Sequence, residues 1–256
     1  MSYIQSVRAE LIKTRRSAAF WLCLAGGAFV PLIFFLSYMI KPSANAKRLI
    51  ADPWVIHFGQ LWQTFSVFLL PMFIILISSM LVQMEYKNNT WKQVYTAPQS
   101  YAGIYFSKLT GIVMMVTLLF IVFNVLSFLA AIIPDLVHNR QFGFSRTRFG
   151  WLKFLGFNGR VLIASLGIIS IQYWISLRFR NFIIPVGIGL ACLIATMLAF
   201  GWEHIYKVPF AYPFLTMQFA ATKGSWLQNH EWNSVGYCFL FIIIGLSDMI
   251  FRKEKG

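Results

Sequence analysis

The side chains of this 256-residue chain that could take part in chemistry are few and lie far apart. The histidines and cysteines are His57, His138, His204, His230, Cys23, Cys192 and Cys238. Their spacing does not match a zinc site, and the cysteines lie in apolar segments, where they act as small fillers. The sequence has no phosphate-binding loop of the form G-x-x-x-x-G-K-[ST], no H-E-x-x-H and no G-x-S-x-G. We therefore predict no catalytic residue, no bound metal and no ATPase site on this chain.

Three polar residues lie inside long apolar segments and are candidates for a functional role. Asn124 and Gln172 fall in the middle of such segments, where an amide lines a path or joins two helices by hydrogen bonds. Asp248 lies four residues before Arg252, so a local ion pair is the simpler role for its carboxylate. Because buried acids are so scarce, an ion- or proton-coupled secondary transporter is only the alternative function.

The segment 85–108 is the most informative about a partner. Trp91, Val94, Tyr95 and Pro98 recur at helical spacing, which predicts a short helix with an aromatic stripe that ends at Pro98. A helix of this kind can dock into a groove of a partner protein. The alternative is an aromatic belt that holds the segment against lipid headgroups, and the two roles are compatible.

The elements that must position these residues are apolar helices. Hydrophobic residues make up 58% of the chain and charged residues 12%, and the mean hydropathy is +0.66. A soluble fold of this size cannot bury so much apolar surface. The net charge is +14, from 22 basic and 8 acidic residues. In so apolar a chain this charge indicates contact with the headgroups of the lipid bilayer, so we expect no nucleic-acid partner.

Stretches without Asp, Glu, Lys or Arg mark the membrane crossings, because a helix needs about 20 apolar residues to cross about 30 Å of hydrocarbon. We predict one permease domain over 1–256, an all-α membrane protein with six transmembrane helices. Their ranges are about 18–40, 61–84, 109–133, 159–177, 182–201 and 233–251. The first part of the apolar stretch 53–84 is expected to lie at the interface. Both termini then share one side, and the basic residues before the first crossing place that side in the cytoplasm.

Two further helical segments are expected outside the crossings. In 2–16, Tyr3, Ile4, Val7 and Leu11 follow helical spacing among charged residues. This pattern predicts an N-terminal amphipathic helix in the cytoplasmic interface. The segment 203–231 is aromatic, broken by prolines and too polar to cross, so we expect short re-entrant helices on the outer side before the last crossing.

In combination, these features resemble the membrane subunit of ABC-2 class ABC exporters. They comprise the basic entry helix ending Glu10-Leu-Ile-Lys-Thr-Arg-Arg16, the six crossings with both ends inside, the outer segment before the last crossing, and the loop after the second crossing. In that loop the residues that fit the family pattern are Glu85, Asn89, Thr90, Pro98, Ser100 and Lys108. The chain departs from the pattern at Asn89, where glycine is common, and at Gln99, which separates Pro98 from Ser100.

The resemblance covers essentially the whole chain and implies a permease in the bacterial cytoplasmic (inner) membrane. It implies a separate cytoplasmic ABC ATPase, which would hold ATP and magnesium, and a second copy or a sibling permease. The cytoplasmic coupling helix that contacts the ATPase would involve Glu85, Asn89, Thr90, Trp91, Val94, Tyr95, Pro98 and Ser100. Compact members of this class include permeases of bacitracin- and lantibiotic-immunity exporters. The expected activity is therefore export of an amphiphilic or peptide-like substrate by alternating access, with no cofactor on this chain.

Overall fold

The computed structural model describes residues 3–15, 17–87, 100–219 and 227–251, and within these ranges every regular element is a helix. Five helical stretches are long and apolar enough to cross a membrane: Ala18–Ile40, Pro53–Lys87, Tyr101–Val137, Trp151–Arg178 and Asn229–Phe251. A further apolar helix, Ile183–Leu198, has 16 residues. The chain is therefore a multi-pass helical membrane protein, which confirms the predicted fold class.

The helices follow one another along the chain with short connections. In order they are α1 (Tyr3–Thr14), α2 (Ala18–Ile40), α3 (Pro42–Arg48), α4 (Pro53–Thr64), the π-helical turn η1 (Phe65–Leu69), α5 (Leu70–Lys87), α7 (Tyr101–Val137), α8 (Trp151–Arg178), α9 (Ile183–Leu198), the 3₁₀ turns η2 (Ile205–Lys207) and η3 (Pro209–Ala211), α10 (Tyr212–Gln218) and α11 (Asn229–Phe251).

The second of the long stretches is one continuous run of 35 residues, made of α4, η1 and α5. Asp52 caps its start by accepting a hydrogen bond from the Val55 N–H, and Pro53 fits the first turn, where no N–H is needed. The turn η1 precedes Pro71, which lacks an N–H and would clash with the carbonyl four residues earlier in a regular α-helix. The first part of 53–84, expected at the interface, is therefore joined to α5 through η1 without a break in the helix.

The other helices also differ from the predicted crossings at their ends, and α8, for example, begins at Trp151 and not near residue 159. α7 begins at Tyr101 behind its N-cap Ser100, so it includes Lys108, which charge counting placed before the crossing. α9 has 16 residues, or about 24 Å at 1.5 Å per residue, which is shorter than the predicted 182–201 and than the hydrocarbon layer of about 30 Å. A helix of this length spans a bilayer only where the bilayer thins locally or flanking residues complete the crossing.

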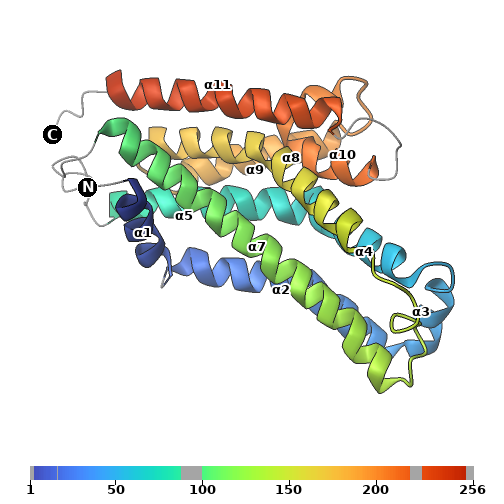
Figure 1. Ribbon diagram of the computed structural model, residues 1–256. Coiled ribbons are helices and arrows are strands. Elements are labelled where there is room, and N and C mark those ends of the chain that lie inside the picture. Colours follow the sequence, from blue (N-terminus) through green and yellow to red (C-terminus); the bar gives the residue numbers. More distant parts are fainter. Residues whose placement is uncertain (1–2, 16, 88–99, 220–226, 252–256) are drawn as a thin grey trace.

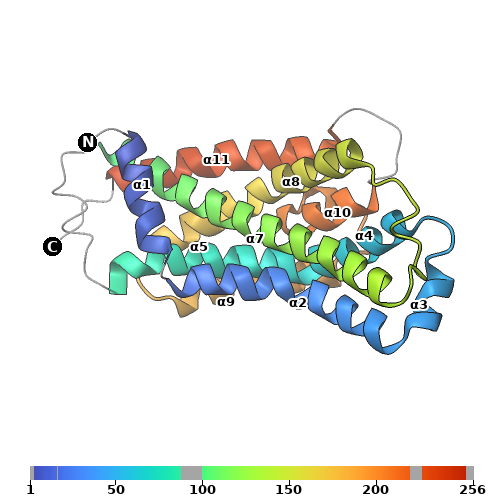
Figure 2. The same cartoon turned by 60° about the horizontal axis from the view of Figure 1, so that its bottom comes forward.

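Figures 1 and 2 show an elongated bundle with α1, the end of α5, the start of α7 and the end of α11 at one end, and α3 at the other. α2 packs along α7, and α11 packs along α8. In the Pro53–Lys87 stretch, 67% of the most apolar window is buried, against 11% for α11. The core therefore lies around α5, and α11 forms an exposed edge. α1 and the end of α11 share one end of the bundle, as an even number of crossings requires.

The segments outside the long helices also take helical form. Between α9 and α11, the short elements η2, η3 and α10 pack against α8 and α11, and Tyr212 and Thr216 of α10 are fully buried. The N-terminal helix α1 packs on α7, where Ser6 and Thr14 are buried and Val7 and Leu11 are half-buried. Its exposed apolar residues are Tyr3, Ile4 and Ile12. A helix with exposed apolar side chains beside the first crossing suits the membrane interface.

Candidate functional site

Four charged side chains from three helices meet at the end of the bundle that carries α1. Lys108 Nζ, near the start of α7, lies 3.0 Å from Glu85 Oε1 near the end of α5. It also lies 3.3 Å from each carboxylate oxygen of Glu10 on α1. Lys13 Nζ, on the same helix as Glu10, lies 3.0 Å from Glu85 Oε1 and 3.5 Å from Glu10 Oε1. We call Glu10, Lys13, Glu85 and Lys108 the ion cluster.

The ion cluster is mostly enclosed. The side chains of Lys108 and Glu85 are each 4% exposed, that of Glu10 is 15% exposed and that of Lys13 is 44% exposed. The two ammonium groups balance the two carboxylates, so every buried charge faces an opposite one. Burial alone lowers the pKa of Lys13, but the carboxylates of Glu10 and Glu85 outweigh this effect and raise the pKa above its usual value. Lys13 therefore stays charged at neutral pH.

Hydrogen bonds fix the start of α7 beside α1. Ser100 Oγ accepts a hydrogen bond from the Gly103 N–H at 3.1 Å, which caps α7. The Tyr3 hydroxyl on α1 lies 2.7 Å from Thr110 Oγ1 and donates to the Phe106 carbonyl at 3.4 Å. These contacts keep α1 and α7 in the register that brings the ion cluster together.

Of the predicted coupling residues, the structure describes the two at the flanks of the loop, Glu85 and Ser100. Outside the described residues lie Asn89, Thr90, Trp91, Val94, Tyr95 and Pro98. The coupling helix therefore stays a prediction, but both of its flanks are anchored, one in the ion cluster and one at the cap of α7. In the sequence, Glu10 and Lys108 stand out only as parts of the family pattern. Their opposite charges, one in the predicted N-terminal helix and one beside the predicted third crossing, were the signal that could have paired them.

The two amides in the crossings connect helices. Gln172 of α8 is fully buried and donates through Nε2 to Ser79 Oγ of α5 at 3.0 Å and to the Pro185 carbonyl of α9 at 2.9 Å. Asn124 of α7 donates through Nδ2 to Asn158 Oδ1 of α8 at 2.7 Å. For both residues these bonds favour the role of a helix-to-helix link over that of a path-lining group.

Two ion pairs join α8 to α11. Asp248 Oδ1 lies 3.0 Å from Arg178 Nη1. Arg252, the partner expected from the sequence, lies outside the described residues. Toward the start of α11, Arg160 Nε lies 2.9 and 3.2 Å from the two carboxylate oxygens of Glu231, whose side chain is fully buried. The carboxylates of Asp248 and Glu231 on α11 therefore both serve to hold α11 against α8.

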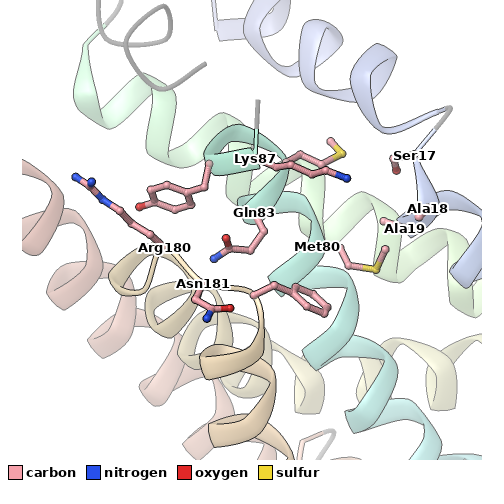
Figure 3. A pocket seen from close by; sticks show the side chains of 11 residues that line it. Ser17, Ala18, Ala19, Met80, Gln83, Lys87, Arg180 and Asn181 are labelled. Carbon is pink, nitrogen blue, oxygen red and sulfur yellow. The ribbon is translucent and has the colours of Figure 1, made fainter. Parts of the chain in front are cut away.

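A cavity of about 900 Å³ opens at the same end of the bundle as the ion cluster (Figure 3). Its walls are the start of α2, the end of α5 and the corner between α8 and α9. Gln83 Nε2 donates to the Phe179 carbonyl at 2.7 Å, and the Tyr86 hydroxyl donates to the Leu177 carbonyl at 2.9 Å. α5 therefore holds the corner in place and gives the cavity a fixed wall.

Comparison with known proteins identifies the family. The family model described as ABC-2 family transporter protein matches residues 6–199, which is most of the chain and includes the whole ion cluster. A search of the curated proteins finds no match. The matched range also covers the first five apolar helices and most of the helix α1 that precedes them. The chain therefore belongs to the ABC-2 transporter family and is the membrane component, or permease, of an ABC transporter.

Proposed function

We propose that this permease is the membrane subunit of an ATP-driven exporter, which moves an amphiphilic or peptide-like substrate out of the cytoplasm by alternating access. The observation that carries the proposal is the ion cluster. It joins α1 to α5 and α7, the two helices that flank the segment 88–99. That segment is the one expected from the sequence to contact a separate ABC ATPase. A movement imposed on it would reach three helices together.

The burial of the ion cluster suits this role because it resists separation of the helices. Moving Lys108 away from Glu85 and Glu10 would separate opposite charges that are buried together, which costs several kcal/mol. α1, α5 and α7 would therefore move as one body when the ATPase closes on ATP. α5 also packs on α8 and α9. The contact of this body with α8 and α9 is where inward- and outward-facing arrangements would differ.

The proposed assembly contains a second copy of the chain or a sibling permease, and an ATPase that holds ATP and magnesium. We place the chain in the cytoplasmic membrane of a bacterium as one domain with six crossings and both termini inside. Family membership supports the ATPase partner. In Figure 1, α1 lies at the same end of the bundle as the end of α11, and basic residues of α1 precede the first crossing. Both observations support the proposal that the two termini lie in the cytoplasm. Resemblance to compact immunity permeases supports bacitracin or lantibiotic peptides as substrates.

Co-purification and uncoupling test this proposal. The tagged full chain, extracted in mild detergent, should bring down a phosphate-loop ATPase. Cells with both subunits should tolerate bacitracin or a lantibiotic better than cells with neither. Trp91→Ala should preserve the protein level but abolish the protection, because it removes an aromatic contact with the ATPase. Trp232→Ala is the matched control, since this exposed tryptophan lies at the start of α11, at the other end of the bundle.

One result would contradict the ATP-driven exporter, and another would contradict the proposed ATPase contact. Purified chain that transports in vesicles without an ATPase and without ATP would remove the proposed energy source. If that transport also stopped in Asp248→Asn, with the melting temperature unchanged, the ion- or proton-coupled carrier would be the better description. Protection that survives in Trp91→Ala but fails in Trp232→Ala would show that 88–99 is not the ATPase contact.

A further inference from the structure

The cavity between α2, α5 and the α8–α9 corner has a positive charge. Lys87 at the end of α5 and Arg180 in the corner both line it, and both are exposed. None of its described lining residues is acidic. Figure 3 shows Arg180 on one side of Gln83 and residues 17–19 on the other. Glu85, two residues before Lys87, lies in the ion cluster instead, with its side chain 4% exposed. An anion in this cavity would therefore meet cations without a competing carboxylate from its walls.

Two helix N-termini add to this positive potential. α2 begins at Ala18 behind its N-cap Ser17, which lines the cavity. α9 begins at Ile183, whose N–H donates to the Oδ1 of Asn181, another lining residue, at 2.9 Å. A helix N-terminus carries a partial positive charge of about half an elementary charge. The charge of the cavity thus comes from fixed backbone as well as from two flexible side chains.

The rest of the cavity wall is mostly apolar. Met80 and Met84 of α5 and Phe182 beside α9 contribute to it. Methionine side chains are flexible and adapt to irregular apolar shapes. The helices that frame the cavity expose Trp21, one turn into α2, and Ile183, the first residue of α9. The apolar wall therefore adjoins the surface that faces lipid, at the level where α2 and α9 begin and α5 ends.

We propose that this cavity binds an anionic phospholipid from the leaflet on the α1 side of the membrane. Its phosphate would lie between Lys87 and Arg180, and one acyl chain would follow Met80, Met84 and Phe182. Inorganic phosphate would satisfy the cations but leave the apolar wall uncovered. A zwitterionic lipid would cover the wall but gain less from the two cations. The combination of charges and an apolar wall selects a lipid with a net negative headgroup.

A lipid titration tests the proposal without reference to transport or ATP, so its outcome is independent of the exporter function. The full chain, with any subunits that co-purify, is delipidated in detergent and titrated with phosphatidylglycerol or phosphatidylcholine. Bound lipid is counted by native mass spectrometry. The wild type should bind phosphatidylglycerol more tightly than phosphatidylcholine.

Removal of the two cations should weaken the binding of phosphatidylglycerol selectively. The double variant Lys87→Gln/Arg180→Gln should lower its affinity about 30-fold, or about 2 kcal/mol, since each basic residue near an anionic lipid contributes about 1 kcal/mol. Phosphatidylcholine binding should change little. The matched control is Lys47→Gln/Arg48→Gln, which removes two exposed cations from α3 at the opposite end and should preserve the preference.

A second variant tests the apolar wall. Ala18→Trp fills the α2 side of the cavity without a change in charge and should weaken the binding of both lipids. The control Ala44→Trp, on the exposed face of α3, should leave the binding of both lipids unchanged. Equal wild-type affinity for the two lipids would overturn the proposal, as would an equal loss in both pairs of charge variants. Complete displacement of phosphatidylglycerol by millimolar inorganic phosphate would also overturn it, because the site would then recognise phosphate alone.

Discussion

Replacement of Lys108 by methionine removes one ammonium group from the ion cluster while preserving much of the side-chain volume. Among the described contacts, the carboxylates of Glu10 and Glu85 then share the single ammonium of Lys13. At the observed Lys108–Glu85 separation of 3.0 Å, the gross attraction lost is about 5 kcal/mol with an effective dielectric constant of about 20. Desolvation offsets part of this attraction, and the net cost of removing one partner of a buried pair is about 3–5 kcal/mol.

For a chain of this length, a loss of about 3–5 kcal/mol lowers the melting temperature by about 10 °C. The measurement is thermal unfolding of the detergent-purified protein followed by size-exclusion chromatography. The second variant in the test is Lys108→Met/Glu85→Met, which restores charge balance because Glu10 and Lys13 remain paired at 3.5 Å. This double variant should recover at least half of the loss, since an apolar pair of similar volume replaces a buried ion pair at little cost.

The matched control is Lys153→Met, which removes an exposed cation from the start of α8 and should change stability by no more than about 0.5 kcal/mol. Two results would contradict a buried ion cluster around Lys108. A melting temperature for Lys108→Met within about 2 °C of the wild type would mean that Lys108 is not held in a buried cluster. The single variant Glu85→Met completes the cycle, and a double variant whose loss equals the sum of the losses in Lys108→Met and Glu85→Met would mean that Lys108 and Glu85 do not interact.

Three further substitutions probe the helix contacts, each by the same melting assay unless stated. Gly189→Ala should cost about 1–3 kcal/mol, because its Cβ would lie 2.6 Å from Gln172 Oε1, and an unchanged melting temperature would show that α9 can shift away from α8. Arg160→Met should cost about 3–5 kcal/mol of stability, because Glu231 stays buried without the Arg160 cation. The double variant Arg160→Met/Glu231→Gln should recover part of the lost stability, and no recovery would contradict the pairing. Asp135→Asn should cost about 1–3 kcal/mol of stability, because the carboxylate accepts hydrogen bonds from three backbone N–H groups of the loop after α7. Trypsin should then cleave this loop faster. Unchanged cleavage would show that other contacts hold the loop.

The long helices were predictable because the length of an apolar stretch can be counted directly from the sequence. A charge-free stretch of sufficient length marks a crossing wherever the lipid is the solvent. The same rule does not give the ends of the helices. It placed the start of the third crossing after Lys108, whereas α7 begins at Tyr101 and continues through the lysine. The helix tolerates this charge because Glu85 and Glu10 neutralise it, and such neutralisation depends on packing between helices far apart in the sequence.

The candidate site was predictable only in part for the same reason. The sequence singled out Glu85 through the family pattern but did not pair it with Lys108 or Lys13. The partner of Asp248 shows the same limit. A local rule pointed four residues along the chain to Arg252, and the structure pairs the carboxylate with Arg178 on another helix. Neighbours along one helix can be counted from the sequence, but neighbours across a helix interface follow only from the packed fold.

The continuous helix α7 connects the two faces of the membrane mechanically. Its 37 residues span about 55 Å at 1.5 Å per residue, well beyond the hydrocarbon thickness of about 30 Å. Lys108 lies near its first turns, and Asp135, which organises the loop that follows, lies near its last. If α7 moves as a rigid rod, a tilt of about 5° around one end moves the other end about 5 Å sideways. A small displacement at the ion cluster would thereby be enlarged at the far mouth of the bundle, with no chain of intervening side-chain rearrangements.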